Sequence, residues 1–214
     1  MFKKFYNSYL AYVLVYTFYF LSFALFSSLI SVYMLGLGFS AGQTSVVVSV
    51  AFFASMLSQP IMGILNDRLS IKKVTLFSFG AIIFIAIYFM QVRDLLGLTI
   101  GYSLVIMLIN GVNPVMDVLA ARSPYTYGKI RIWGTIGYAL GSQLAGVLYQ
   151  YVSPTAIFIA FIGAMIITIV GVLSIKIRSE SPKSDKVNET KKDSYISQIL
   201  TNKTYLYYLL IVAI

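Results

Sequence analysis

Six long apolar segments constrain this chain more than any other feature of its sequence. A helix needs about 20 mostly apolar residues to cross roughly 30 Å of hydrocarbon. The chain is 59% hydrophobic and only 11% charged, whereas a soluble domain carries about a quarter charged residues. Lipid offers the backbone no hydrogen-bond partners, so each segment must satisfy its own backbone groups as a helix. We therefore predict an all-α membrane protein with spanning helices at residues 9–34, 44–65, 74–92, 95–119, 132–152 and 154–177.

The composition also excludes several classes of function. The chain has no cysteine and no histidine, so it lacks thiolate metal ligands, disulfides and the commonest general base. We predict no catalytic residue, no metal site and no cofactor, and we do not expect an enzyme. The net charge is +9, but the lysines and arginines lie in loops between apolar segments and not along one helix face. This distribution argues against a nucleic-acid partner.

The positive charges predict the orientation of the chain in the membrane. With the N-terminus in the cytoplasm, every lysine and arginine except Arg93 falls on or near the cytoplasmic side. Such an excess is typical of cytoplasmic loops. The first apolar segment is too long for a signal peptide and lacks a cleavage site of small residues. We expect a multi-pass protein of the cell membrane, with the lipid bilayer as its first partner.

The C-terminal part of the chain predicts two further regions after the bundle of residues 1–178. Residues 179–193 are rich in charge, and we expect a solvated cytoplasmic linker there. Residues 194–214 begin with helical spacing of apolar residues, which predicts a short interfacial helix. The apolar run at 204–214 then reaches only about half-way across a bilayer, so it predicts the start of a seventh helix.

Residues 59–73, QPIMGILNDRLSIKK, lie between the second and third apolar segments. Their order of glycine, acidic and basic residues resembles the loop between helices 2 and 3 of the major facilitator superfamily, roughly G-x-L-x-D-R-x-G-R-K/R. Ser70 stands where that pattern usually has glycine, and Ile71 where it often has arginine. The other reading is an ordinary basic loop with a turn. The resemblance implies a gating loop that steadies the outward-facing state, formed by Gly63, Asp67, Arg68, Lys72 and Lys73.

Asp117 is the only acidic residue within a predicted span. An ionisable group there is costly, and it usually marks a pathway or a paired site. Arg131 is as far after the turn near Pro124 as Asp117 is before it, and equal offsets in a helical hairpin give equal depth. We therefore predict that Asp117 and Arg131 face each other. They form either part of a solute site or a purely structural ion pair.

The residues around this pair point to one branch of the superfamily. PVMD at Pro114–Asp117 and YGKIRIWG at Tyr127–Gly134 are similar to the oligosaccharide:proton symporters. By that match Asp117 and Arg131 hold sugar hydroxyls, and Tyr138 stacks on the sugar ring. The other reading is that Tyr138 only packs. The second motif also resembles permeases for aromatic acids and nucleosides.

Aromatic residues form one face of the first predicted helix, at Tyr9, Tyr12, Tyr16, Tyr19, Phe23 and Phe26. If this face lines a cavity, the hydroxyls of Tyr16 and Tyr19 bind solute. If it faces lipid or another helix, it is packing surface.

Small residues form one face of the 132–152 helix, at Gly134, Gly137, Gly141 and Ala145. Such a face lets two backbones approach closely, so we expect a tight crossing with the first helix or another neighbour.

The resemblance implies proton-coupled transport of a small polar, sugar-like solute by alternating access. It implies two inverted three-helix repeats and a chain that is the N-terminal half of a twelve-helix carrier. The expected partners are the solute, protons and the C-terminal half of the transporter. Three alternatives stay open: a truncated permease without transport activity, a permease of the same branch for nucleosides or aromatic acids, and a seven-helix receptor or channel.

Overall fold

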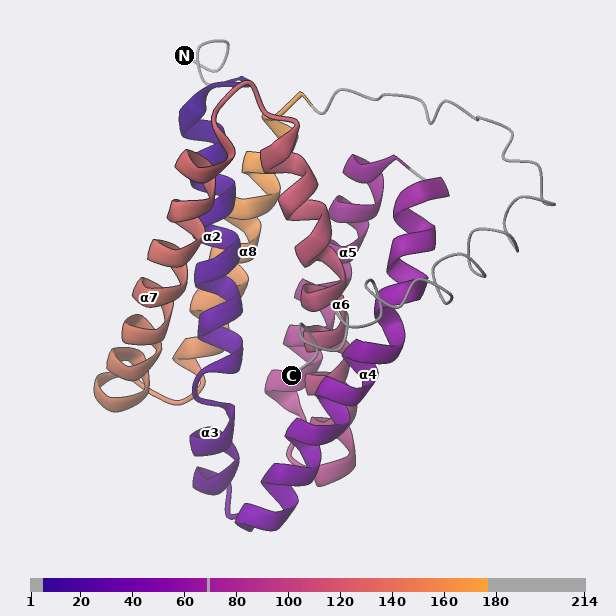
Figure 1. Cartoon of the computed structure of the whole chain (residues 1–214). Coiled ribbons are helices and arrows are strands. Elements are labelled where there is room, and N and C mark those ends of the chain that lie inside the picture. The colour runs from indigo at the N-terminus through magenta and orange to yellow at the C-terminus, as the bar shows by residue number, and fades with distance from the viewer. Residues whose placement is uncertain (1–5, 69, 177–214) are drawn as a thin grey trace, which may run out of the picture. The chain divides into compact units, whose positions relative to one another are not determined.

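The structure, a computed structural model, describes residues 6–68 and 70–176, with the backbone alone at 66–68. All regular secondary structure in this part of the chain is helical. The predicted linker at 179–193 and the predicted segment at 194–214 lie outside the described residues. The helices are α2 (Tyr9–Ser27), α3 (Ile30–Gly36), α4 (Ala41–Arg68), α5 (Ile71–Gln91), α6 (Leu95–Ala121), α7 (Tyr127–Tyr151) and α8 (Ala156–Leu173) (Figure 1).

Five stretches among the described residues are long and apolar enough to cross a membrane. They are Tyr9–Gly36, Ala41–Leu65, Ile71–Gln91, Leu95–Ala121 and Ala156–Leu173. The fifth predicted span, 132–152, corresponds to α7, which is a helix of 25 residues and therefore about 37 Å long. It has the length of a span but is less apolar than the others, because glycine, serine, glutamine and charged residues interrupt its apolar positions.

The first predicted span is two helices and not one. The chain leaves helical geometry at Leu29, between α2 and α3. Just before this break, the hydroxyl of Ser27 donates to the Phe23 carbonyl oxygen (2.8 Å). Serine side chains compete for backbone carbonyls in this way and often bend helices. The bond from Ser27 is therefore a local feature that favours a bend at this end of α2.

The helices pack as two groups of three. α2 packs mainly on α7 and α8, whereas α6 packs mainly on α4 and α5. These groups lie on opposite sides of the ribbon view (Figure 1). If the six spans are numbered in chain order, one group contains spans 1, 5 and 6, and the other contains spans 4, 2 and 3. Replacing span 1 by span 4, span 5 by span 2 and span 6 by span 3 converts the first group into the second. This is the packing pattern of two three-helix repeats with inverted topology.

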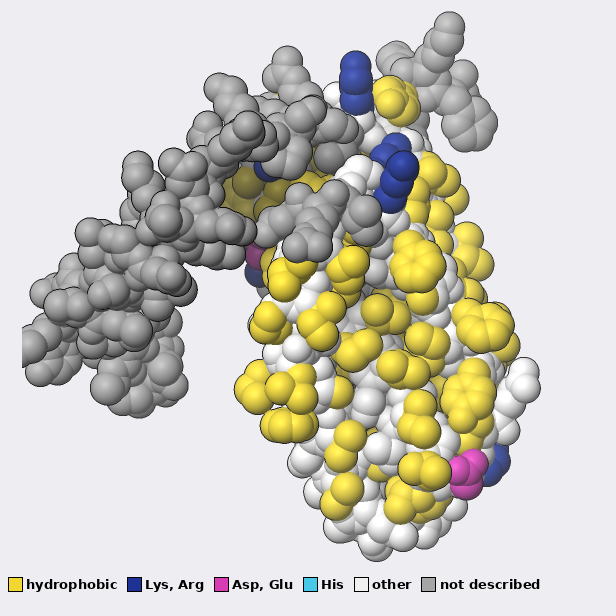
Figure 2. Space-filling view, turned by 90° about the vertical axis from the view of Figure 1, so that its right-hand side faces the viewer, with side chains coloured by type: hydrophobic (Ala, Val, Ile, Leu, Met, Phe, Trp, Pro, Cys, Tyr) yellow, Lys and Arg dark blue, Asp and Glu magenta, His cyan; other side chains and the backbone are white. Residues whose placement is uncertain are grey.

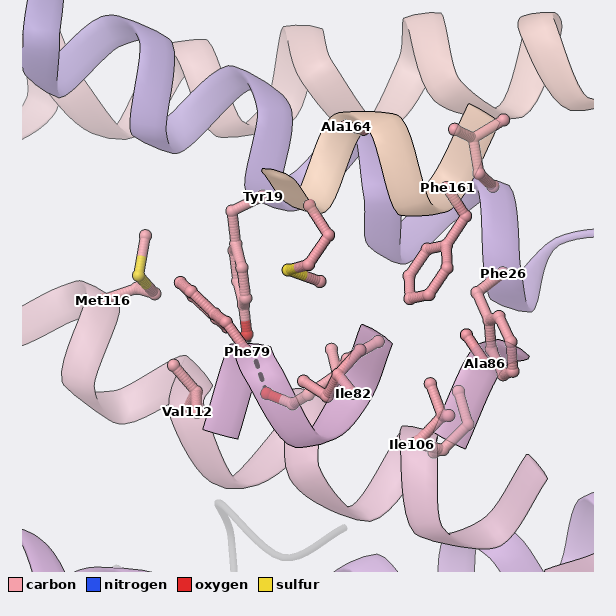
Figure 3. Close-up of a cluster of buried hydrophobic side chains, with 14 of the residues drawn as sticks. Tyr19, Phe26, Phe79, Ile82, Ala86, Ile106, Val112, Met116, Phe161 and Ala164 are labelled. Carbon is pink, nitrogen blue, oxygen red and sulfur yellow. Dashed lines mark hydrogen bonds between the residues drawn. The ribbon is translucent and has the colours of Figure 1, made fainter. Parts of the chain in front are cut away.

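The core between the groups is apolar and aromatic. Tyr19 and Phe26 of α2 are fully or almost fully buried, as are Phe79 of α5, Ile106 of α6 and Phe161 of α8. Figure 3 shows these side chains pointing toward one another from the four helices. The ring of Phe26 stacks on Tyr102, with 5.6 Å between centroids. Phe89 of α5 also meets Phe158 of α8 edge-on, with 5.2 Å between centroids, so aromatic contacts join the two groups.

The outer surface carries many large apolar side chains. Phe77 and Phe84 of α5 are 79% and 76% exposed, which fits helices that face lipid. Figure 2 shows hydrophobic side chains over the middle of one face, with lysine and arginine side chains near one end and basic and acidic side chains together near the other. We call the first of these the basic end; apart from Arg131, the lysines and arginines on this side whose side chains are described are Lys72, Lys73, Arg122, Lys129 and Lys176.

Candidate functional site

The structure brings Asp117 and Arg131 together, as predicted from their offsets. Nη1 of Arg131 on α7 donates to Oδ1 of Asp117 on α6, at 2.8 Å. Both side chains are 43% exposed, so this is not a sealed pair. It crosses between the two groups of helices at the basic end, where α6 ends and α7 begins.

A pocket of about 400 Å³ opens beside Arg131. The guanidinium carbon of Arg131 lies 5.4 Å from the ring centroid of Phe20 on α2, within cation–π range. Tyr138 also lines the pocket, and its ring meets Phe23 edge-on at 5.9 Å. Arg131 and Tyr138 therefore share one cavity, whereas Asp117 is not among its lining residues and bonds to Arg131 beside it. The lining is Phe20, Phe23, Arg131, Gly134, Thr135, Tyr138 and Ala139.

Several residues of this site were not among the sequence predictions. Phe20 lies off the predicted aromatic face, and no pattern singled it out. Tyr127 donates its hydroxyl to Oδ1 of Asp117 at 3.2 Å. The sequence could have indicated Tyr127, because this residue is the first of the motif at Tyr127–Gly134 and lies one helical turn before Arg131. The motif alone does not say where its hydroxyl points.

Tyr16 and Tyr19 lie away from the pocket. Both are fully buried, and their hydroxyls donate to α6: Tyr16 to the Met116 carbonyl, and Tyr19 to the Ile109 carbonyl at 2.7 Å. These carbonyls flank Pro114, which sits inside α6. In this conformation both tyrosines therefore pack α2 against α6, and their role in binding solute stays a prediction.

A chain of polar side chains continues from Tyr19 across three helices. The Tyr19 hydroxyl is 3.0 Å from Oδ1 of Asn113, and Nδ2 of Asn113 donates to Asn110 at 3.4 Å. Nδ2 of Asn110 then donates to Oγ of Ser55 on α4, at 3.1 Å. Hydrogen bonds of this kind link membrane helices whose surroundings offer no water.

The loop between α4 and α5 is shorter than the gating loop that the sequence predicted. α4 continues to Arg68, so Gly63, Asp67 and Arg68 belong to a helix. No described neighbour lies close to Gly63, because a Cβ placed there would meet no atom within 4 Å. Ser70, at the usual glycine position, caps α5 by accepting from the Lys73 backbone N–H.

Lys72 and Lys73 differ in their contacts. Nζ of Lys72 donates to the carbonyl oxygens of Leu173 (3.1 Å) and Ile175 (3.2 Å), at the end of α8. A cation there satisfies carbonyls that the helix leaves unpaired and opposes the negative end of the helix dipole. Lys73 makes no such side-chain bond within the described ranges. Lys72 thus ties the start of α5 to the end of α8.

Comparison with known proteins agrees with this arrangement of helices. The model of the MFS_1 like family matches residues 9–214. The chain belongs to the MFS_1 like family. This confirms the resemblance to the major facilitator superfamily that the sequence motifs indicated.

The similar proteins are sugar permeases. The chain is 27% identical to the lactose permease of Citrobacter freundii over 160 residues, which are 69% of this chain and 38% of that protein. It is 28% identical to the sucrose permease of Escherichia coli over 69% of this chain and 39% of that protein. It is 29% identical to the raffinose permease of Escherichia coli over 56% and 31%. The matched part of the chain spans less than two fifths of each of these relatives.

Proposed function

We propose that this chain is the N-terminal half of a secondary transporter that moves a small, sugar-like solute by alternating access coupled to protons. One observation carries the proposal: Arg131, which is paired with Asp117, lines an aromatic-walled pocket in a membrane bundle. The relatives named above are permeases for lactose, sucrose and raffinose, and this supports a sugar as the solute.

The chemistry of the pocket suits a polyhydroxylated ring. Arg131 offers a planar fork of donors and Asp117 offers carboxylate acceptors, a combination that suits neighbouring hydroxyl groups. Tyr138 and Phe20 offer aromatic surface to the less polar face of a ring. A pocket of about 400 Å³ lies in the range of about 300–1,000 Å³ typical of small-molecule sites. Asp117, Arg131 and Tyr138 are therefore the proposed solute-binding residues.

Alternating access requires a second bundle against which the first moves. We propose that a C-terminal half supplies it and that the 214-residue chain alone does not transport. In liposomes carrying a proton gradient, this chain should then take up no more lactose, melibiose or sucrose than empty vesicles do. Robust uptake by the chain alone would overturn this part of the proposal and would indicate a working homodimer.

Sugar binding can be tested at Arg131 with a matched pair of variants. Lysine at position 131 keeps the charge but loses the donor fork, so R131K should weaken binding of lactose or melibiose about tenfold. K129R, two residues away on the same helix, should bind as the unchanged chain does. Binding is followed by the fluorescence of Trp133, the single tryptophan. Tighter binding of a nucleoside or an aromatic acid than of any sugar would favour another permease of the same branch.

The orientation is also a proposal: the basic end and the N-terminus face the cytoplasm, in the cell membrane. Because the chain has no cysteine, single cysteines report exposure directly. Lys129 and Arg93 are both exposed and lie at opposite ends of the bundle. An impermeant thiol reagent added outside intact cells should label R93C and spare K129C. The reverse result would invert the topology.

A further inference from the structure

Two donors from one face of α7 meet a single oxygen of Asp117. Arg131 Nη1 lies 2.8 Å from Oδ1, and the Tyr127 hydroxyl lies 3.2 Å from the same atom. The two donor residues are four positions apart, one turn of a helix, so they share a face. Among the side chains that the structure describes, at residues 6–65 and 70–176, no donor bonds to Oδ2. Within this part of the chain one oxygen of the carboxylate is thus held twice, and the other has no partner.

We infer that Tyr127 is a positioning residue that keeps Oδ2 of Asp117 free to accept a hydrogen bond from a solute hydroxyl. The inference rests on the proposed function, and it adds a specific atom and a specific residue to it. The terminal torsion of an aspartate is soft, so Asp117 depends on its partners for orientation. An arginine often donates to both oxygens of a carboxylate at once, and neither oxygen is then free. To form these two bonds the carboxylate of Asp117 would have to rotate, and a second donor on Oδ1 opposes that rotation.

The other hydroxyls near Asp117 do not replace Tyr127. Tyr16 and Tyr19 approach from α2, but their hydroxyls bond to the carbonyls of Met116 and Ile109 on α6. Among the described residues, Arg131 is the cation that bonds to Asp117, and Tyr127 is the neutral donor. Removing the Tyr127 hydroxyl therefore leaves the carboxylate to Arg131 alone.

The test removes that hydroxyl and keeps the ring. Y127F, in the full chain in lipid nanodiscs, is titrated with lactose, melibiose, sucrose and raffinose while Trp133 fluorescence is recorded. We expect about fivefold weaker binding than in the unchanged chain, the size of one half-exposed bond to a charged group. The matched control is Y151F, at the other end of α7, where the side chain is 75% exposed. It should bind as the unchanged chain does.

A double-mutant cycle separates positioning from a general effect on the fold. If Tyr127 acts through the carboxylate, Y127F should cause no further loss in a D117A background. An equal loss in both backgrounds, or binding by Y127F as tight as in the unchanged chain, would overturn the inference and leave the proposed function standing. If the unchanged chain binds none of the four sugars, the proposed function fails and this inference fails with it. Circular dichroism of Y127F checks that its helix content is unchanged.

Discussion

The α2–α7 crossing and the α4–α6 crossing occupy equivalent places in the two groups of three helices, but different contacts hold them. At the α2–α7 crossing the backbones touch. A Cβ added at Gly137 would collide with the Thr17 carbonyl, and one at Gly141 would collide with backbone atoms of Leu21. Ala145 is fully buried on the same face. The predicted stripe of small residues therefore does meet the first helix.

Side chains separate the helices at the α4–α6 crossing. Gly111 of α6 faces the flexible side chain of Met62, where an added Cβ would lie 2.6 Å from Cγ. Asn110, the residue just before Gly111, donates to Ser55 of α4 at 3.1 Å. Methionine adapts its shape and polar bonds re-form after small shifts. The comparison teaches that one group of three helices is fixed by backbone shape at its main crossing, whereas the equivalent crossing of the other group is joined by contacts that can adjust.

The largest expected effect is at the glycine crossing. G137A places a methyl group against backbone that has no rotamer to change, so we expect a loss of about 3 kcal/mol, at the upper end for overpacking. The thermal unfolding midpoint in detergent, followed by circular dichroism, measures it. The control is G146A on the same helix, where a Cβ meets nothing within 4 Å among the described atoms. Equal midpoints for the two variants would remove the claimed backbone contact.

G111A tests the other crossing in the same way. The added methyl group meets the side chain of Met62, which can move aside, so we expect a loss of only about 1 kcal/mol. The same unfolding midpoint is measured. A loss as large as that of G137A would show that both crossings are equally rigid.

The ion pair between the groups should give the next effect. Asp117 and Arg131 are each 43% exposed, so the cost of removing one partner should be near 1 kcal/mol and not the larger value of a buried pair. D117N and R131Q should each lower the unfolding midpoint more than the double variant does, because each leaves one charge alone. K129Q serves as the control. A double variant less stable than either single one would contradict this.

The polar bridge at the α4–α6 crossing should contribute about 0.6 kcal/mol, as hydrogen bonds between membrane helices do on average. S55A removes the acceptor and leaves the Asn110 amide without its partner on α4. S45A, where the serine bonds only to its own helix, is the control for a serine-to-alanine change in α4. Identical unfolding midpoints would mean that packing alone holds this crossing.

The smallest loss of stability is expected where α5 of one group meets α8 of the other. K72M removes the cation that caps α8, which should cost about 0.5 kcal/mol at an exposed helix end and less at high salt. K73M, next to it, should leave the unfolding midpoint unchanged. If the two variants lower the midpoint equally, the bonds from Lys72 to α8 contribute nothing specific.

Much of the site could be predicted because it depends on local geometry. Asp117 and Arg131 sit at equal distances from one turn, so their pairing follows from helix rise alone. The tight face of α7 follows from the spacing of its glycines. Ser70 departs from the glycine usual in the family, and the structure explains it as the cap of α5. What the local pattern missed was the direction of a side chain, as at Tyr127.

By itself, the sequence determined that this chain forms apolar helices, where each span begins and ends to within about five residues, and which charges lie near one another; it did not show the break at Leu29 inside the first span. These properties depend on hydropathy and on spacing along a helix. Only the tertiary structure decided which partners the helices have across the bundle. Tyr16 and Tyr19 have α6 as their partner instead of an open cavity, and Lys72 caps a helix about a hundred residues away. Such contacts depend on how six helices are arranged around one another, and no short stretch of sequence encodes that arrangement.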